Sequence, residues 1–252
     1  MPQLSAIVIT RNEAHNIRPC LDGVAFCDER IVVDCGSSDD TVAIARAAGA
    51  RVLHHDWTGF GAQKNFALAQ ATGDWVLSLD ADERVTPALA AEIKAAIAMK
   101  KAQGYEMPRS STFCGTRIRH CGWSPDYVLR LFRRDSGRFS DDLVHEHVIC
   151  DGRIRRLTQP LIHHTIRSPE DARAKIEHYS EAGAAMLLAR GRRIARWRAP
   201  VHGAVAFLKV YVFRRGFLDG RAGSAVARYQ AATTYHRYRK AWRAQREANG
   251  SQ

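Results

Sequence analysis

Polar side chains that could bind a charged ligand gather at three places in the first third of the chain, and each place directly follows a short apolar run. The clusters are Thr10-Arg11-Asn12-Glu13, then Asp34-Cys35-Gly36-Ser37-Ser38-Asp39-Asp40-Thr41, and finally Asp80-Ala81-Asp82. In an open α/β sheet, ligands bind outside the carboxyl ends of the strands. Turn and helix-cap chemistry would explain any one cluster alone. Three together predict a ligand site at one edge of a sheet.

The cluster at residues 80–82 indicates which ligand. Asp80 and Asp82 are one residue apart behind an apolar run, so their carboxylates can project toward a common point. Proteins hold Mg²⁺-type cations with one or two carboxylates, while phosphate oxygens and water fill the remaining positions. This chemistry suits a nucleotide diphosphate, and an exposed acidic turn is the alternative.

The elements that must position these clusters alternate along the chain. Strand patterns over 4–10, 30–34, 51–54 and 74–80 are separated by helical patterns, including 16–26, 41–48 and 87–102, and this alternation is typical of a parallel sheet of βα units. Short strand patterns follow over 105–165. A helix is expected from Ser168, a capping residue followed by proline and two acids, and the remaining chain has helical patterns.

Composition excludes several classes of protein. The 252 residues are 46% hydrophobic and 25% charged, near the averages for globular proteins, so disordered, collagen-like and polytopic membrane chains are excluded. The N-terminus lacks a secretory signal pattern, and no window reaches the ~18 uninterrupted apolar residues of a spanning helix. Six cysteines without a C-x-x-C pair indicate reduced thiols. We therefore expect a cytoplasmic protein.

Charge is distributed unevenly along the chain. Residues 1–104 carry a net charge of −3, whereas residues 105–252 carry +15. This asymmetry predicts that the C-terminal part meets a polyanion, either nucleic acid or an anionic lipid surface.

The motifs together resemble those of inverting family-2 glycosyltransferases with the GT-A fold. The three clusters and Lys64-Asn65 occur in the family's order. A narrower likeness, to the subgroup that adds glucose to the inner core of bacterial lipopolysaccharide, rests on Val144-His145-Glu146, Leu161-Ile162-His163-His164, Lys175 to Tyr179 and Gly216-Phe217-Leu218-Asp219-Gly220. The resemblance implies a GT-A (Rossmann-like) nucleotide-sugar-binding sheet with a C-terminal helical extension.

The resemblance also implies residue roles. The 10–13 segment and the Asp34 turn, with Gly36, Ser37 and Asp39, would contact the uracil and ribose of a UDP-sugar. Asp82 would bind Mg²⁺ or Mn²⁺, with Asp80 toward the ribose or the metal. Lys64 would contact the diphosphate or ribose, or else be a solvated lysine at a helix start. From its place near the end of a late strand, the imidazole of His164 or His163 could complete the metal shell or touch the diphosphate, or else have a structural role.

An inverting transfer needs a carboxylate base for the acceptor hydroxyl. Two candidates compete, Glu146 and the pair Asp141-Asp142, and Glu146 is favoured. The signature Gln-x-x-Arg-Trp of processive members is absent, because Arg193 stands three residues before Arg196-Trp197. A single sugar is therefore expected per acceptor.

The basic C-terminal region allows two interpretations. Several arginines flank the apolar stretch 199–213, which suits burial in the headgroup region of an anionic membrane. The alternative is a core helix of a helical subdomain. Aromatic residues interleaved with basic ones over 221–246 are also compatible with single-stranded nucleic acid, but no RNA-binding motif is present, so no nucleic acid is expected.

These observations predict residues 1–165 as a catalytic domain, with a nucleotide-binding half at 1–104 and an acceptor-side half at 105–165. Residues 166–252 are expected to form a basic helical region at the cytoplasmic face of the inner membrane. The predicted activity is non-processive transfer of a hexose, glucose by resemblance, from a UDP-sugar to lipopolysaccharide core or another lipid-linked glycan. A nucleotidyltransferase and a non-catalytic polyanion-binding protein are the alternatives.

Overall fold

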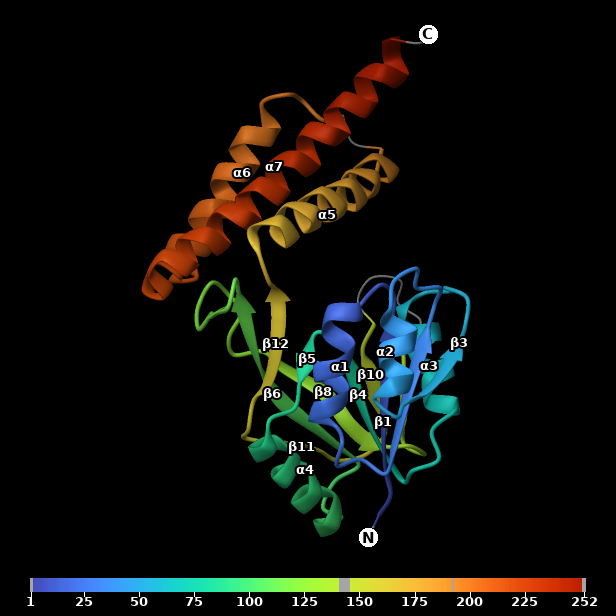
Figure 1. Ribbon diagram of the computed structural model, residues 1–252. Helices are drawn as coiled ribbons and strands as arrows, with labels where there is room; N and C mark the ends of the chain where they lie inside the picture. Colours follow the sequence, from blue (N-terminus) through green and yellow to red (C-terminus); the bar gives the residue numbers. More distant parts are fainter. Residues whose placement is uncertain (1, 141–145, 192, 251–252) are drawn as a thin grey trace. The chain divides into compact units, whose positions relative to one another are not determined.

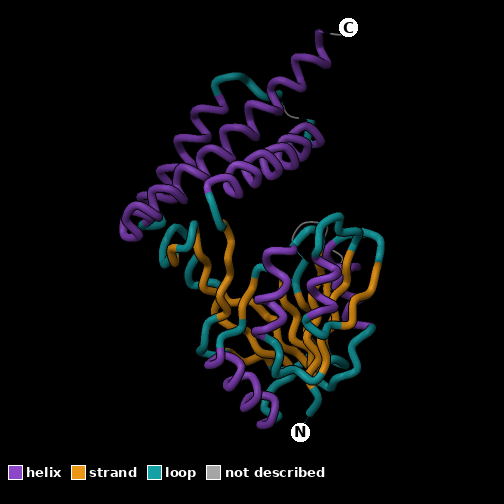
Figure 2. Tube along the Cα trace, viewed as in Figure 1, coloured by secondary structure: helices purple, strands orange, loops and turns teal. Residues whose placement is uncertain are grey.

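The computed structural model describes residues 2–140, 146–191 and 193–250. The chain forms two compact units, each from two segments. The first, here called the sheet unit, comprises residues 1–110 and 126–163. The second, the helical unit, comprises residues 111–125 and 164–252. Figure 2 shows strands concentrated in the first unit and helices in the second. Segment 111–125, expected with the sheet, belongs to the helical unit.

The strands have the central order β3-β2-β1-β4-β8-β6-β12-β5. β1, β2, β3 and β4 are parallel, whereas β8 pairs antiparallel with β4. Short β7 and β11 pair with β6, and β9 and β10 form a separate hairpin. The strands are β1 Leu4–Thr10, β2 Glu29–Asp34, β3 Arg51–His54, β4 Trp75–Asp80, β5 Glu83–Arg84, β6 Gly104–Phe113, β7 Thr116–Arg117, β8 Tyr127–Arg133, β9 Gly137–Phe139, β10 Val148–Cys150, β11 Ile154–Arg156 and β12 Leu161–Ile166.

The described residues of the sheet unit also form the helices α1 Ala14–Gly23, α2 Thr41–Ala47, α3 Phe60–Ala69 and α4 Pro87–Met99 (Figure 1). α4 begins as its sequence predicts, because the Thr86 hydroxyl accepts a hydrogen bond from the Leu89 amide and Pro87 occupies the first turn. It ends at Lys100, whose φ of 50° is left-handed. α3 is missing from the helices that the sequence predicts, since its short pattern contains glycine and little periodicity.

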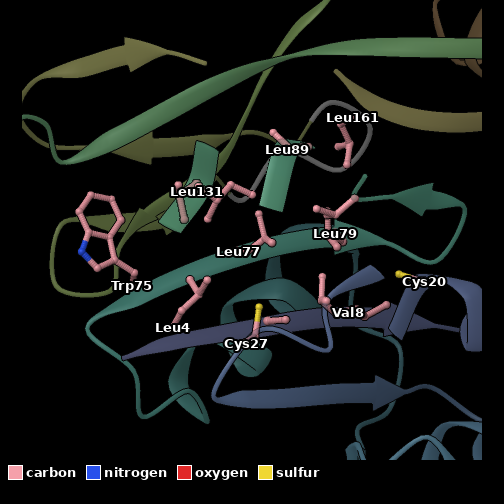
Figure 3. Close-up of a cluster of buried hydrophobic side chains, with 14 of the residues drawn as sticks. Leu4, Val8, Cys20, Cys27, Trp75, Leu77, Leu79, Leu89, Leu131 and Leu161 are labelled. Carbon is pink, nitrogen blue, oxygen red and sulfur yellow. The ribbon is translucent and has the colours of Figure 1, made fainter. Parts of the chain in front are cut away.

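Alternation along the parallel strands gives the sheet two apolar faces. Ala6, Val8, Val32, Leu77 and Leu79 share one core cluster with side chains of α1, α2 and α4 (Figure 3). Their neighbours along the strands, such as Ile7, Val33 and Val76, pack on the other face with Ala67 of α3. Strands buried on both faces explain the nearly continuous apolar runs in the sequence.

The helical unit is built on a long helix, α7, which spans Gly220–Gly250. α5 (Pro169–Ala189) and α6 (Arg198–Leu208) pack along it, and α6 continues into a π-helical turn over Lys209–Phe213 (Figure 1). A 3₁₀ turn over Gly216–Asp219 precedes α7. As predicted, the Ser168 hydroxyl caps α5 by accepting from the Asp171 amide. None of the described helices combines the length and the apolar character that crossing a membrane requires.

Candidate active site

The three polar clusters meet at the carboxyl end of β1. β1 lies between β2 and β4, and the pairing register sets Thr10 beside Asp34 and Ile9 beside Asp80. Asp34 and Asp80 therefore flank the same strand end, although 46 positions separate them in the chain. This confirms the sequence prediction that the clusters share one edge of the sheet.

Hydrogen bonds join the loop after β1 to the loop after β2. The Asn12 amide donates to the Ser37 hydroxyl over 2.8 Å, and the Ser38 amide donates to Oδ1 of Asn12 over 2.8 Å. The Glu13 amide donates to the Thr41 hydroxyl over 2.7 Å. Asn12 has a φ of 56°, a left-handed conformation that asparagine tolerates better than most residues. The two loops thus form one preorganised polar rim.

Asp34 and Asp39 shape this rim. The buried Asp34 carboxylate accepts from the amides of Gly36 and Ser37, both over 2.9 Å, and from the Ser37 hydroxyl. Asp39 accepts from the Thr41 amide and hydroxyl and from the Ala14 amide. The Thr41 hydroxyl bond is the largest influence on Asp39 and lowers the pKa of its carboxyl. Both carboxylates therefore hold the turn after β2 and the starts of α1 and α2 in place.

Thr10 is the member of the rim with an unused polar atom. Its side chain is 5% exposed, and its hydroxyl has no hydrogen-bond partner among the described residues. Buried hydroxyls are nearly always hydrogen-bonded. A ligand or water at the strand end would supply the missing partner.

Lys64 connects α3 to the acidic cluster. Its side chain is 3% exposed, and its ammonium lies 2.9 Å from Oδ1 of Asp80 and 3.0 Å from Oε1 of Glu146. This burial excludes the alternative of a solvated lysine. Asn65 next to it exchanges two hydrogen bonds with the backbone of Phe139, which fixes β9 beside α3.

The Asp80 carboxylate is paired with two cations. Besides Lys64 it accepts from Arg130, and Arg130 also lies 2.8 Å from the fully buried Glu83. Burial alone would raise the pKa of Asp80, but Arg130 and Lys64 together hold it well below its usual range. Burial likewise opposes the charge of Arg130, whereas Asp80 and Glu83 raise its pKa. Asp80 therefore makes ion pairs with two cations in this structure, and its role toward the ribose or the metal stays a prediction.

Of the two candidate histidines, His163 rather than His164 lies beside Asp82. Nε2 of His163 lies 3.3 Å from Oδ2 of Asp82. Neighbouring side chains on a strand point to opposite faces, and Nδ1 of His164 instead lies 3.3 Å from the Thr112 hydroxyl. His163 therefore replaces His164 beside Asp82. The described residues contain no group of three or more His, Cys, Asp or Glu side chains arranged for a metal.

The two candidate assignments for the base differ in whether the structure describes them. Glu146 joins the site through Lys64, whereas Asp141 and Asp142 lie outside the described residues. Arg11 is exposed at the rim.

All six cysteines are free, and burial raises the pKa of the Cys20 and Cys27 thiols to about 12.

The family model "Glycosyl transferase family 2" matches residues 5–156, which include every cluster described above. The chain belongs to this family. An uncharacterized glycosyltransferase of Rickettsia felis is 30% identical over 236 residues, covering 88% of this chain and 83% of that protein. The lipopolysaccharide core biosynthesis glycosyltransferase LpsC of Rhizobium meliloti is 29% identical over 256 residues, covering 93% of each.

A solved structure provides a further comparison. Glucosyl-3-phosphoglycerate synthase from Mycobacterium tuberculosis, in complex with Mn²⁺, UDP and phosphoglyceric acid, is 18% identical, with a TM-score of 0.46 and coverage of 68% of this chain and 72% of that one. The mixed α/β sheet and the family match confirm the expected GT-A class with a helical C-terminal part.

Two residues of this family-2 glycosyltransferase site are absent from our sequence-based set. Glu83 directly follows the acidic cluster, and Arg130 stands in the apolar run of β8. The sequence does offer one signal for Arg130. It is a charged residue between Leu129 and Leu131, in an apolar run that indicates a strand inside the sheet. A buried charge needs a buried partner, so Arg130 predicts an acid on a neighbouring element.

Proposed function

We propose that this protein transfers a single hexose, with inversion, from a UDP-sugar to lipopolysaccharide core or another lipid-linked glycan, and that glucose is the sugar. The family is established by sequence, and the donor, sugar and acceptor belong to the proposal. The observation that carries it is the meeting of three polar clusters at the end of β1, with Asp34 and Asp80 in register on either side.

The nucleoside half of the donor is assigned to the rim formed by residues 10–13 and 34–41. The Thr10 hydroxyl offers a buried, unpartnered group, and the loops around it are held by their own hydrogen bonds. Lys64 carries three N–H donors, of which two are directed at Asp80 and Glu146. The third has no acceptor among the described residues, and we assign it to a diphosphate or ribose oxygen.

A divalent cation fits beside Asp82. A carboxylate and an imidazole 3.3 Å apart supply two ligands, and the donor diphosphate and water would supply the others. Asp82 and His163 would hold Mg²⁺ or Mn²⁺ there, which would offset the negative charge of the departing UDP. Lys64 and Arg130 neutralise Asp80, so its negative charge is balanced next to the proposed metal site.

Glu146 is the proposed base. In an inverting transfer the acceptor oxygen attacks the anomeric carbon while the bond from that carbon to the UDP oxygen breaks. The proton of the attacking hydroxyl passes to the base. Lys64 holds Glu146 next to the acidic cluster, which supports its assignment. The pair Asp141-Asp142 is the competing assignment.

A lipid-linked acceptor would place the enzyme at the cytoplasmic face of the inner membrane. The similarity to LpsC over 93% of the chain supports a lipopolysaccharide acceptor. The net charge of +15 in residues 105–252 suits an anionic lipid surface.

The test is UDP release from a panel of UDP-sugars, with and without lipopolysaccharide core, in Mn²⁺, in Mg²⁺ and in EDTA. We expect acceptor-dependent release that is greatest with UDP-glucose and that EDTA abolishes. Pyrophosphate release from UTP and a sugar phosphate would instead favour the nucleotidyltransferase alternative. Absence of UDP binding would favour the non-catalytic one.

A further inference from the structure

Helix α6 is packed on one side only. Ala199 and Gly203 face α7, and a Cβ at Gly203 would lie 3.2 Å from Cβ of Tyr235. The ring of His202 stacks on Tyr238 with centroids 4.1 Å apart. These contacts define the covered face of the helix.

The opposite face carries a row of large apolar side chains. Trp197, Val201, Val205, Leu208 and Val212 are between 47% and 61% exposed. Their spacing of four, four, three and four residues keeps them on one side of a helix. We call this row the apolar stripe. A surface helix normally presents polar residues on the face that points away from its neighbours. Because α6 is apolar on that face, we expect a partner to cover it.

The stripe continues into the turns before α7. Phe213 is 80% exposed, and Phe217 and Leu218 are about half exposed. Isolated apolar side chains on a surface need no explanation, but a contiguous row marks an interaction site.

The surroundings of the stripe are strongly basic. Residues 190–246 contain fifteen lysines and arginines and a single acid, Asp219. That acid is 5% exposed and bound to His120, so it offsets little charge at the surface. Arg196 and Arg198 border the start of the stripe, and Arg214 and Arg215 follow its end.

A basic aromatic groove adjoins the stripe. Its volume is about 690 Å³, and its lining is Arg196, Trp197, Ala199, Pro200, Tyr235, Arg239, Trp242 and Arg243. The guanidinium groups of Arg196 and Arg246 lie 5.8 and 5.3 Å from the Trp242 ring centroid. Trp197 belongs to both groove and stripe. Arginine binds phosphate groups through two parallel N–H donors, and its guanidinium also stacks on aromatic rings, so this groove suits a phosphate ligand.

We propose that α6 docks on an anionic phospholipid bilayer. The apolar stripe would lie at the boundary between the headgroups and the acyl chains, and the groove would bind a lipid phosphate. The inference builds on the proposed lipid-linked acceptor, but its observations come from the helical unit alone. A second copy of the chain would bring two strongly positive faces together. Nucleic acid would match the arginines and leave the stripe exposed.

The test is co-sedimentation of the full chain with vesicles of phosphatidylcholine alone and with 30% phosphatidylglycerol. The stripe variant is Val205→Glu with Leu208→Glu, and its control is Met99→Glu with Ile154→Glu, which places the same two charges on exposed apolar sites of the sheet unit. The groove variant is Arg196→Ala with Arg243→Ala, and its control, Arg18→Ala with Arg46→Ala, removes the same charge from exposed helix positions of the sheet unit. Circular dichroism checks that each variant folds.

We expect binding to anionic vesicles only, weakened by high salt and reduced at least tenfold in the stripe variant. The groove variant should bind roughly 25-fold more weakly, since each of the two basic residues at an anionic surface contributes about fivefold. The two controls should bind like the parent.

Equal binding to both vesicle types, or a stripe variant that binds normally, would overturn the proposal. A concentration-dependent dimer abolished by the stripe variant, or RNA that competes fully with vesicles, would assign the surface to those partners instead. UDP release by the stripe variant with a detergent-solubilised acceptor tests the catalytic proposal separately.

Discussion

Nε2 of His163 lies 3.3 Å from Oδ2 of Asp82, and the next residue, His164, is bonded to Thr112. We expect Asp82→Ala and His163→Ala each to weaken Mn²⁺-dependent UDP binding by at least about tenfold, because each removes a proposed ligand. His164→Ala is the matched control and should leave the metal dependence unchanged. Calorimetric titration with UDP, with and without Mn²⁺, measures this directly. Unchanged metal dependence in Asp82→Ala would remove the assignment.

The choice between the two histidines shows a limit of sequence analysis. Strand periodicity predicts that His163 and His164 face opposite sides of the sheet, but it does not predict which of them faces the acidic cluster. That depends on the pairing of β12 with β5, where His163 stands opposite Glu83. The pairing joins residues 80 positions apart, and no local pattern encodes it.

The parallel strands and the edge where the clusters meet were predictable, because apolar runs and capping residues are local signals. Lys64 was only half predictable. Its type suits a phosphate contact, but its burial depends on α3 packing against the sheet and on Glu146 approaching from 82 positions later. Arg130 and Glu83 depend on the antiparallel pairing of β8 with β4, which is also a long-range feature.

Arg130→Met should destabilise the sheet unit by about 3 kcal/mol. Among the described residues, the fully buried Glu83 would then keep only the more distant Arg109 as a cationic partner, besides the Asp80 amide. Arg133→Met, on the same strand but one-third exposed, should cost less than about 1 kcal/mol. Urea unfolding of both variants gives the comparison. Adding Glu83→Gln to Arg130→Met should recover part of the loss, because the unpaired charge is removed. Equal stability of the two single variants would contradict a structural role for the pair.

Glu146→Gln should retain UDP binding and lose transfer by about 10²- to 10⁴-fold, the usual contribution of general-base catalysis. The amide keeps the shape of the side chain and can still accept a bond from Lys64. Asp142→Asn is the competing variant, and UDP release with acceptor measures both. Near-normal turnover in Glu146→Gln together with loss in Asp142→Asn would move the base to the acidic pair.

Asp219→Asn should destabilise the helical unit. The buried carboxylate accepts from the His120 ring over 2.9 Å and from the amides of His120 and Arg119 over 2.8 and 3.2 Å. An asparagine must turn its own N–H₂ toward one of these donors, which leaves a buried group unpaired at a cost of about 1–3 kcal/mol. Asp56→Asn, at a fully solvated carboxylate, is the control and should change nothing.

The pH dependence of this difference identifies the charge. Burial would raise the pKa of Asp219, but its hydrogen bonds from His120 and Arg119 outweigh burial and lower it. A lowered pKa means that the stabilisation is fully present above the ordinary aspartate value of about 3.9 and is lost as the pH falls below it. Urea unfolding should therefore give a constant difference between parent and Asp219→Asn from pH 8 to 5, which then shrinks toward pH 3. A difference that stays constant down to pH 3 would mean that the shape of the side chain, rather than its charge, holds the turn in place.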